Sequence, residues 1–277
     1  MPEVIDAHQH FWTVARGDYG WMTPDLGPLL RDFGPDDLHP LMQRTGVART
    51  ILVQAAETEA ETEFLLSIAA RTDWVAGVVG WADMQSSDFP ARLAHWQAKP
   101  KWVGLRPMLQ EQDPDRILAP VFLENLAHVA ARRVPFDILT HVRHLPALIT
   151  ALDRTPGLVA VIDHLSKPSI AAGGFDEWSS LIARVAAHPG ISCKVSGLVT
   201  EAGPDWTLDR IRPYIERVAA LFGPHRLIFG SDWPVCTLAG SYAEVVALSR
   251  GVLSDLYAPE DLAAIFGGNA TRFYGVA

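Results

Sequence analysis

The chain has 277 residues, a length that suits one large domain of about 250 residues. Its composition, 49% hydrophobic and 20% charged, allows a large core in a protein that is not disordered. The formal net charge of -9, without a cluster of lysines or arginines, argues against nucleic acid as a partner.

Eight short apolar segments recur along the chain, most of them followed by a longer stretch with helical periodicity. The predicted strands are Val4–His8, Thr50–Gln54, Val75–Gly80, Val103–Arg106, Phe136–Thr140, Val159–Asp163, Ile191–Val195 and Leu227–Gly230. Clear amphipathic helices are predicted at Glu57–Arg71, Leu118–Arg133, Phe175–His188, Leu208–Phe222 and Ser241–Leu253. Alternating strands and helices imply parallel pairing, and no GxGxxG motif follows the first strand. The pattern therefore predicts an α/β fold, a single-domain (β/α)8 TIM barrel over residues 1–277.

The longest gap between predicted elements follows the first strand, at about residues 13–34, and contains Tyr19 and Trp21 just after Trp12. In a barrel this loop lies at the C-terminal mouth, where active sites are built. It is either a lid over the site or a surface insertion that covers an edge, and the sequence leaves both interpretations open.

Several features bear on the compartment. The N-terminal residues enter a strand-like segment at once, without the basic and apolar regions of a signal peptide. No stretch of about 18 apolar residues predicts a membrane span. Cys193 and Cys236 are the only cysteines and lie far apart, which indicates reduced thiols rather than a disulfide framework. We expect a cytoplasmic protein without membrane partners; the pattern gives no indication of its oligomeric state.

The first strand ends in two histidines with one residue between them. Asp6, His8 and His10 share one parity along the strand, so we expect all three to face the same side. Two imidazoles at this spacing can reach one metal ion or one substrate group at the mouth. Histidines of this kind also occur as satisfied core residues, but the position at a strand end favours a site.

Polar residues close the last three strands as well. Asp232 follows the eighth strand, where it is suited to general base work, although an aspartate there can also cap a helix. His164 follows the sixth strand. On the seventh, the apolar residues should face the helices, which directs Lys194 inward toward a negative partner, Asp232 or Asp6. A structural ion pair is the alternative for Lys194.

Two further strand ends carry hydrogen-bonding groups. Arg106 closes the fourth strand, where its fork of donors suits a carboxylate or a lactone oxygen. Gln54 closes the second strand and offers a further hydrogen bond. Six strands thus end in polar groups that suit a site, and core packing does not explain such convergence.

At these residues the chain resembles the amidohydrolase superfamily, in particular its amidohydrolase-related branch of lactonases. The matching segments are Asp6–Trp12, Val161–Pro168, Lys194–Leu198, Gly230–Pro234 and Gly268–Tyr274. The resemblance implies a barrel in which Asp232 deprotonates the attacking water and His164 lines the same site. It also implies that His8 and His10 bind either a divalent metal or the substrate.

The sequence departs from the two-metal members of that superfamily. Arg106 stands where those enzymes present a bridging lysine or glutamate on the fourth strand, and the fifth predicted strand contains no histidine, although His141 and His144 follow it. We therefore expect at most one metal ion, zinc foremost, held by His8, His10 and Asp232, with His164 as a candidate fourth ligand. A metal-independent enzyme stays open.

The resemblance to lactonases implies hydrolysis of a neutral sugar lactone such as L-fuconolactone or L-rhamnonolactone. Asp232, His164 and Lys194 are the expected catalytic residues. The residues expected to bind the substrate are Trp12, Gln54, Arg106, His141 and Trp233, with Trp21 as a further aromatic candidate. The alternatives are a lactonase for dicarboxylates, a metal-dependent decarboxylase of the same superfamily, and a non-catalytic barrel that binds sugar acids. No GxSxG motif supports a serine nucleophile.

Overall fold

The computed structural model describes residues 3–276, and its eight strands form one parallel sheet in the order β1 to β8. The strands are β1 (Ile5–Gln9), β2 (Arg49–Val53), β3 (Val75–Gly80), β4 (Trp102–Leu105), β5 (Phe136–Ile138), β6 (Ala160–Ile162), β7 (Ile191–Val195) and β8 (Leu227–Phe229). The Asp232 amide donates to the carbonyl of His8 at 2.8 Å, and the His10 amide donates to that of Trp233 at 2.7 Å. These bonds join β1 to the segment after β8, which confirms the predicted barrel.

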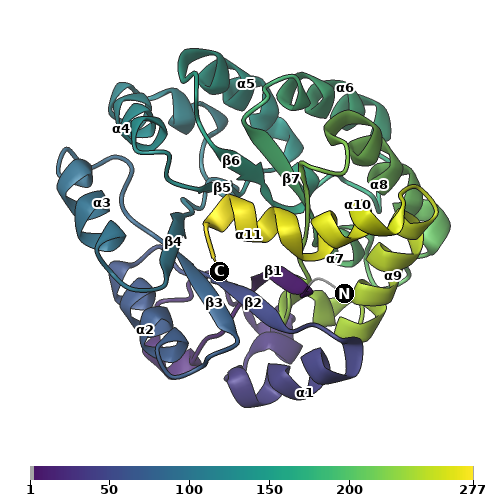
Figure 1. Cartoon of the computed structure of the whole chain (residues 1–277). Coiled ribbons are helices and arrows are strands. Elements are labelled where there is room, and N and C mark those ends of the chain that lie inside the picture. The colour runs from purple at the N-terminus through teal and green to yellow at the C-terminus, as the bar shows by residue number, and fades with distance from the viewer. Residues whose placement is uncertain (1–2, 277) are drawn as a thin grey trace.

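Helices form a ring around the strands (Figure 1). Five of them confirm the predicted helices to within two residues at each end: α2 (Glu59–Ala69), α4 (Pro120–Ala131), α6 (Phe175–Ala186), α8 (Leu208–Phe222) and α9 (Tyr242–Ser254). The periodicity did not single out the others: α1 (Pro35–Thr45), α3 (Phe89–Gln97), α5 (Leu145–Arg154), α7 (Leu198–Ala202), α10 (Pro259–Ala263) and α11 (Asn269–Tyr274).

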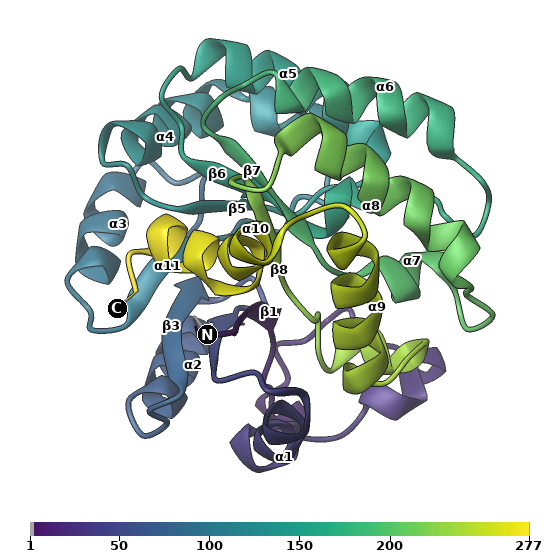
Figure 2. The same cartoon turned by 45° about the vertical axis from the view of Figure 1, so that its right-hand side comes forward.

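The barrel interior is apolar at its N-terminal end, where α11 crosses the opening (Figures 1 and 2). Small aliphatic side chains from the strands meet residues of α11 in one buried cluster. Its members include Ile5, Ala7, Ile51, Val53, Val161, Ile228, Ala270 and Tyr274. This plug leaves only the C-terminal end of the barrel available for a site.

A bulge in β1 changes the expected direction of one side chain. The register with β2 shifts between Asp6 and Gln9, so that the simple alternation of the strand is broken. The prediction that Asp6 faces the same side as His8 and His10 was therefore wrong. The Asp6 carboxylate instead accepts hydrogen bonds from the Ser231 amide at 2.8 Å and the Tyr242 hydroxyl of α9 at 3.1 Å.

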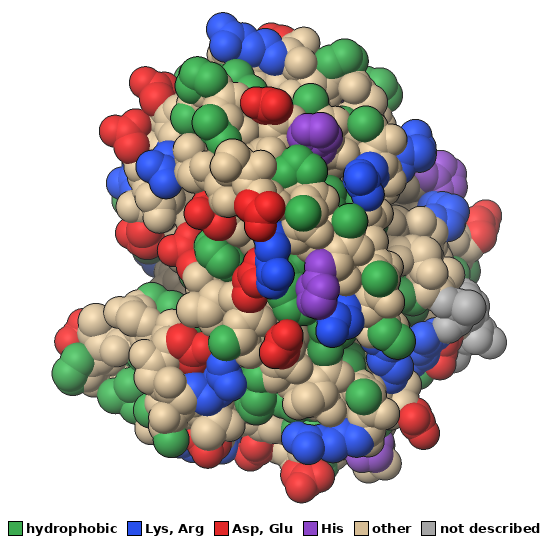
Figure 3. Space-filling model, turned by 90° about the vertical axis from the view of Figure 1, so that its left-hand side faces the viewer, with side chains coloured by type: hydrophobic (Ala, Val, Ile, Leu, Met, Phe, Trp, Pro, Cys, Tyr) green, Lys and Arg blue, Asp and Glu red, His purple; other side chains and the backbone are tan. Residues whose placement is uncertain are grey.

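The surface carries charges of both signs. On the side of the molecule drawn in Figure 3, acidic and basic side chains alternate without forming one continuous patch of either sign. Among the described residues, no helix is long and apolar enough to cross a membrane.

Candidate active site and metal centre

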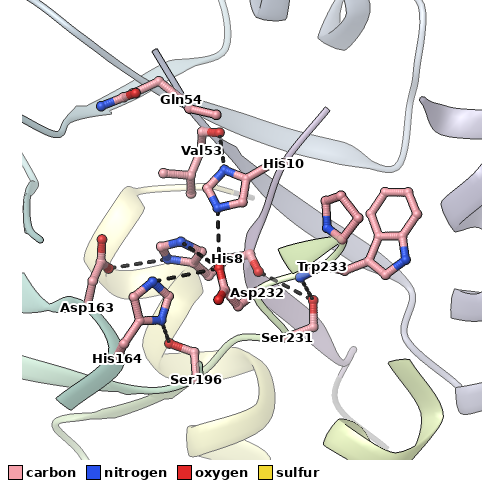
Figure 4. Close-up of polar contacts among 12 residues, drawn as sticks. His8, His10, Val53, Gln54, Asp163, His164, Ser196, Ser231, Asp232 and Trp233 are labelled. Carbon is pink, nitrogen blue, oxygen red and sulfur yellow. Dashed lines mark hydrogen bonds and ion pairs between the residues drawn. The ribbon is translucent and has the colours of Figure 1, made fainter. Parts of the chain in front are cut away.

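Three histidines surround one carboxylate at the C-terminal mouth of the barrel (Figure 4). The Nε2 atoms of His8, His10 and His164 lie 3.7, 3.4 and 3.7 Å from Oδ1 of Asp232. These residues come from the ends of β1, β6 and β8. The structure thus brings together the four residues that the strand ends predicted as the centre of the site.

The other ring nitrogen of two of these histidines has a partner that fixes the ring. Nδ1 of His10 lies 2.8 Å from the carbonyl oxygen of Val53, and Nδ1 of His164 lies 2.9 Å from Oγ of Ser196. Both contacts leave Nε2 directed at Asp232 (Figure 4). Burial lowers the pKa of His164 to about 4, so its ring is neutral at neutral pH.

Asp232 is held as a carboxylate. Burial acts to raise its pKa, but the interactions with the surrounding His164, His10 and His8 outweigh burial and lower the pKa below the usual range. The backbone of Asp232 has a φ of 59°, in the left-handed region that non-glycine residues rarely adopt. Such a conformation costs roughly 1–3 kcal/mol and is typical of functional positions.

Below this cluster lies a buried layer of ion pairs around Lys194. Its Nζ contacts Oδ2 of Asp137 at 2.5 Å, Oδ1 of Asp163 at 3.0 Å and Nδ1 of His8 at 3.1 Å. Arg106 adds a contact of 3.3 Å to Asp163. Lys194 points inward as expected, but its predicted partners were wrong. Asp137 of β5 and Asp163, which directly follows β6, neutralise it rather than Asp232 or Asp6. In the sheet, β6 pairs with β7 and β5 is the next strand beyond β6.

A rare left-handed turn follows β6. Residues His164, Leu165, Ser166 and Lys167 all have φ between 47° and 59°. Each non-glycine residue in this conformation costs roughly 1–2 kcal/mol. The turn is held by a bond of 2.7 Å from Trp178 Nε1 to the Leu165 carbonyl and by a contact of 3.0 Å between the Thr140 and Ser166 hydroxyls. The turn directs both of its end residues, His164 and Lys167, into the same cavity.

A cavity of about 220 Å³ opens above the histidine cluster. This volume lies below the roughly 300–1,000 Å³ of pockets for drug-sized ligands, so the cavity suits a small ligand. Its lining includes His10, Arg106, His164 and Asp232, and also Trp21, Leu26, Leu29, Met108, Gln110, Lys167, Thr200, Val235 and Leu238. The loop after β1 thus contributes one wall.

Four of the residues predicted to bind the substrate do not line this cavity. Trp12 is fully buried, and its Nε1 donates to the carbonyl of Arg31 at 2.8 Å within the loop. Trp233 packs edge-on against Phe33. These aromatic rings stabilise the base of the loop, and of the three tryptophans named from the sequence only Trp21 reaches the cavity.

The two polar members of that set are also engaged elsewhere. Gln54 is buried and points away from the histidine cluster (Figure 4), where its Nε2 donates to the carbonyl of Arg106 at 2.7 Å. His141 lies at the rim, one-third exposed, with its Nε2 3.8 Å from Glu111. Gln54 therefore positions Arg106, and only Arg106 of the polar set lines the cavity.

The sequence also indicates that Asp137 faces into the barrel. Phe136 and Ile138 pack toward the helices, so the residue between them faces inward by the alternation that located Lys194. Lys167 and Asp163 lie within a segment noted for its resemblance, but the left-handed turn that aims Lys167 has no signature in the sequence.

The donor set suits a divalent metal ion. His8, His10 and Asp232 form one group whose ligand atoms lie within 4.8 Å of one another, and His8, Asp163 and His164 form another. Tetrahedral zinc, with bonds of about 2.0–2.2 Å, needs neighbouring ligand atoms about 3.3 Å apart. The separations of 3.4 and 3.7 Å around Asp232 are close to that value. In the second group, Asp163 is already paired with Lys194 and Arg106.

Comparison with known proteins places this site in a family. The family model described as "Amidohydrolase" matches residues 5–276. The chain is 46% identical over 276 residues to an L-fucono-1,5-lactonase of Burkholderia ambifaria, which covers 98% of this chain and 95% of that protein. A second L-fucono-1,5-lactonase, from Burkholderia multivorans, is 37% identical over 98% of this chain and 96% of its own length.

A solved structure agrees with these matches. The crystal structure of an amidohydrolase from Burkholderia multivorans with bound Zn superposes with a TM-score of 0.94 at 36% identity. The superposition covers 99% of this chain and 100% of that one. By sequence and by structure, the chain belongs to the amidohydrolase family.

Proposed function

We propose that the protein hydrolyses a sugar aldonolactone, such as L-fuconolactone or L-rhamnonolactone, to the aldonic acid. The observation that carries the proposal is the carboxylate of Asp232, which lies among three histidine Nε2 atoms beside a small cavity. The names of the two lactonase relatives support the substrate class.

In the proposed reaction, Asp232 takes a proton from a water molecule as the water oxygen attacks the lactone carbonyl carbon. The bond between that carbon and the ring oxygen then breaks, and Asp232 returns the proton to the ring oxygen. The product is an open-chain hydroxy acid, and its ionisation releases one proton to the solution. His164, fixed through Ser196, and Arg106 stabilise the charge that develops on the carbonyl oxygen.

We assign Lys194 an electrostatic role in this scheme. Its ammonium group lies 3.1 Å from Nδ1 of His8 and is fully buried among aspartates. Together with burial, which comes first, its charge keeps the pKa of His8 well below the usual value. A neutral His8 is the form that a metal ion requires.

We further propose that one zinc ion is held by His8, His10 and Asp232, with His164 as a fourth candidate ligand. Such an ion supplies Lewis acidity and lowers the pKa of a bound water toward about 7. The donor types and their spacing support this assignment, as does the bound Zn of the Burkholderia multivorans relative.

A neutral lactone suits the cavity better than a dicarboxylate. Two anionic groups would need several cations without other partners. The cavity is lined by Arg106 and Lys167, but Arg106 is already paired with Asp163 at 3.3 Å. The apolar wall formed by Trp21, Leu26 and Leu29 also favours a ligand with an unhydroxylated edge.

A pH-indicator assay of the purified protein tests the proposal. The panel contains L-fuconolactone, L-rhamnonolactone, a pyrone dicarboxylate lactone and a dihydroxybenzoate, with carbon dioxide release measured for the last. We expect the highest catalytic efficiency on a sugar lactone. Preference for the dicarboxylate lactone would overturn the substrate class and keep the mechanism, whereas carbon dioxide release without lactone hydrolysis would overturn both.

A further inference from the structure

The cavity has two unlike walls. One is the apolar wall of Trp21, Leu26 and Leu29 from the loop after β1, continued by Val235 and Leu238 after β8. The other, which we call the polar wall, consists of Gln110, Lys167 and Thr200. None of these three residues has a role in the steps described above, although all three line the cavity in which the lactone would react.

The left-handed turn after β6 fixes the position of Lys167. This residue ends the turn, which begins at His164, and its amide donates to the His164 carbonyl at 2.7 Å. A Cβ atom on Gly197 would lie 2.7 Å from Nδ1 of His164, so glycine is needed for the turn to sit where it does. The turn therefore fixes Lys167 relative to His164, three residues earlier, and hence relative to the reacting centre.

The ammonium group of Lys167 can still donate hydrogen bonds to a ligand. Its Nζ lies 3.7 Å from Oε1 of Glu201, beyond the 2.7–3.2 Å typical of a hydrogen bond. Only about a fifth of its side chain is exposed. Glu201 offsets the positive charge, which disfavours an anionic ligand and suits a neutral group with oxygen acceptors.

Gln110 and Thr200 each carry a buried oxygen without a partner. Oε1 of Gln110 and Oγ1 of Thr200 accept no hydrogen bond from any described residue. Nine-tenths or more of buried polar groups in proteins have a partner, so each such atom needs an explanation. The Gln110 backbone is fixed by a bond of 2.8 Å from Arg143 Nη2 to its carbonyl, and Thr200 lies in α7, directly after β7.

We propose that the polar wall is the subsite that recognises the ring hydroxyls of the lactone, with Lys167 as its main donor. This inference rests on the proposed function. A hydroxyl group both donates and accepts, so it can satisfy the amide oxygen of Gln110 and the ammonium of Lys167, whereas a carboxylate cannot donate to Gln110. The apolar wall then receives the edge of the sugar ring that carries no hydroxyl.

The test compares two substrates across matched variants. Catalytic efficiency is measured on L-fuconolactone and on δ-valerolactone, which has no ring hydroxyl. Lys167→Met is expected to lower the ratio of the efficiency on L-fuconolactone to that on δ-valerolactone by about 10- to 100-fold. Thr200→Val is expected to lower the same ratio by at least several-fold. Thr200→Ser keeps the hydroxyl and should keep the ratio. Lys99→Met, which removes a lysine outside the cavity, is the matched control.

The possible results distinguish a failure of the subsite proposal from a failure of the proposed function. If the wild type prefers L-fuconolactone and both Lys167→Met and Thr200→Val keep that preference, the subsite is refuted and the function stands. A wild type without preference for the hydroxylated lactone overturns both. Glu201→Gln separates recognition from an ion pair: an equal loss in this variant would make Lys167 a structural residue. If Lys167→Met fails to fold, the ratio for Thr200→Val decides.

Discussion

At the scale of single residues, the site consists of two layers with different tasks. The upper layer consists of three histidines around Asp232, and its members His10, His164 and Asp232 line the cavity. The lower layer of Lys194, Asp137, Asp163 and Arg106 is fully or almost fully buried. A buried lysine is costly unless it is paired, and here two carboxylates compensate it. Through the contact between Lys194 and Nδ1 of His8, the lower layer fixes the His8 ring, while the cavity beside the upper layer stays open to the substrate.

The first prediction concerns the general base. Asp232→Asn should lower kcat on the preferred lactone by at least about 100-fold, because the amide cannot accept the proton of the attacking water. Circular dichroism and thermal unfolding should show a folded protein. Asp205→Asn, at an exposed position, is the control. Near wild-type turnover in the Asp232 variant would remove Asp232 from the role of base.

The second prediction is that each chain binds at most one divalent ion. The two candidate groups share His8, and Asp163 in the second group is already occupied by Lys194 and Arg106. Elemental analysis of the purified protein should find one zinc ion or fewer, and His10→Ala should reduce that content. Two tightly bound ions per chain would contradict the assignment. Full activity after exhaustive chelation would show that the reaction proceeds without the metal.

At the scale of elements, the eight strands and the four central site residues followed from the sequence, because strand ends in a parallel barrel converge on one mouth. The alternation rule succeeded for Lys194 in β7, where the strand is regular. It failed for Asp6, since the bulge in β1 reverses the direction of that side chain. Loops have no such periodicity. Only the structure therefore shows which residues form the cavity walls, and that Trp12, Gln54 and His141 contact other parts of the protein instead.

The third prediction concerns α11, the helix that plugs the barrel. The Tyr274 hydroxyl contacts both carboxylate oxygens of Asp137, at 3.0 and 2.9 Å, and ties the plug to the lower layer. Tyr274→Phe should lower the free energy of unfolding by about 1.5–3 kcal/mol, as expected for a hydrogen bond to a charged group. Urea denaturation measures the change.

The control for this experiment is Tyr257→Phe. Its hydroxyl donates to the neutral carbonyl of Ala219 at 2.8 Å, so we expect a loss of only about 1 kcal/mol. An equal or smaller loss for Tyr274→Phe would show that α11 does not depend on this bond.

At the scale of the whole molecule, stability depends on how many protons the buried acids bind. Burial raises the pKa of Asp6 to about 6, that of Asp137 to about 6 and that of Glu61 to about 8. In each case the folded state holds a proton at a pH where the unfolded state has lost it. These three groups therefore stabilise the fold most at low pH, and their contribution falls as pH rises through the folded-state value.

The effect of one buried acid on the pH dependence of stability can be measured at Glu61. Its carboxylate, in the first turn of α2, accepts hydrogen bonds from the amides of Ala55 at 3.0 Å and Ala56 at 2.7 Å. Burial is the largest influence and raises its pKa from 4.5 to about 8, although these bonds and the charge of Arg106 oppose the rise. Between those two values the contribution of Glu61 to the free energy of unfolding should decrease by about 1.4 kcal/mol per pH unit.

The fourth prediction is that Glu61→Gln removes this decrease. A glutamine does not titrate, so the difference in unfolding free energy between wild type and variant should shift in favour of the variant from pH 6 to pH 8. The lost amide contacts lower the stability of the variant by the same amount at every pH, which leaves the slope as the diagnostic quantity. Urea denaturation at four pH values measures it, and the other titrating groups cancel in the comparison. Parallel pH profiles would mean that Glu61 is ionised in the folded protein throughout this range, with its backbone hydrogen bonds outweighing its burial.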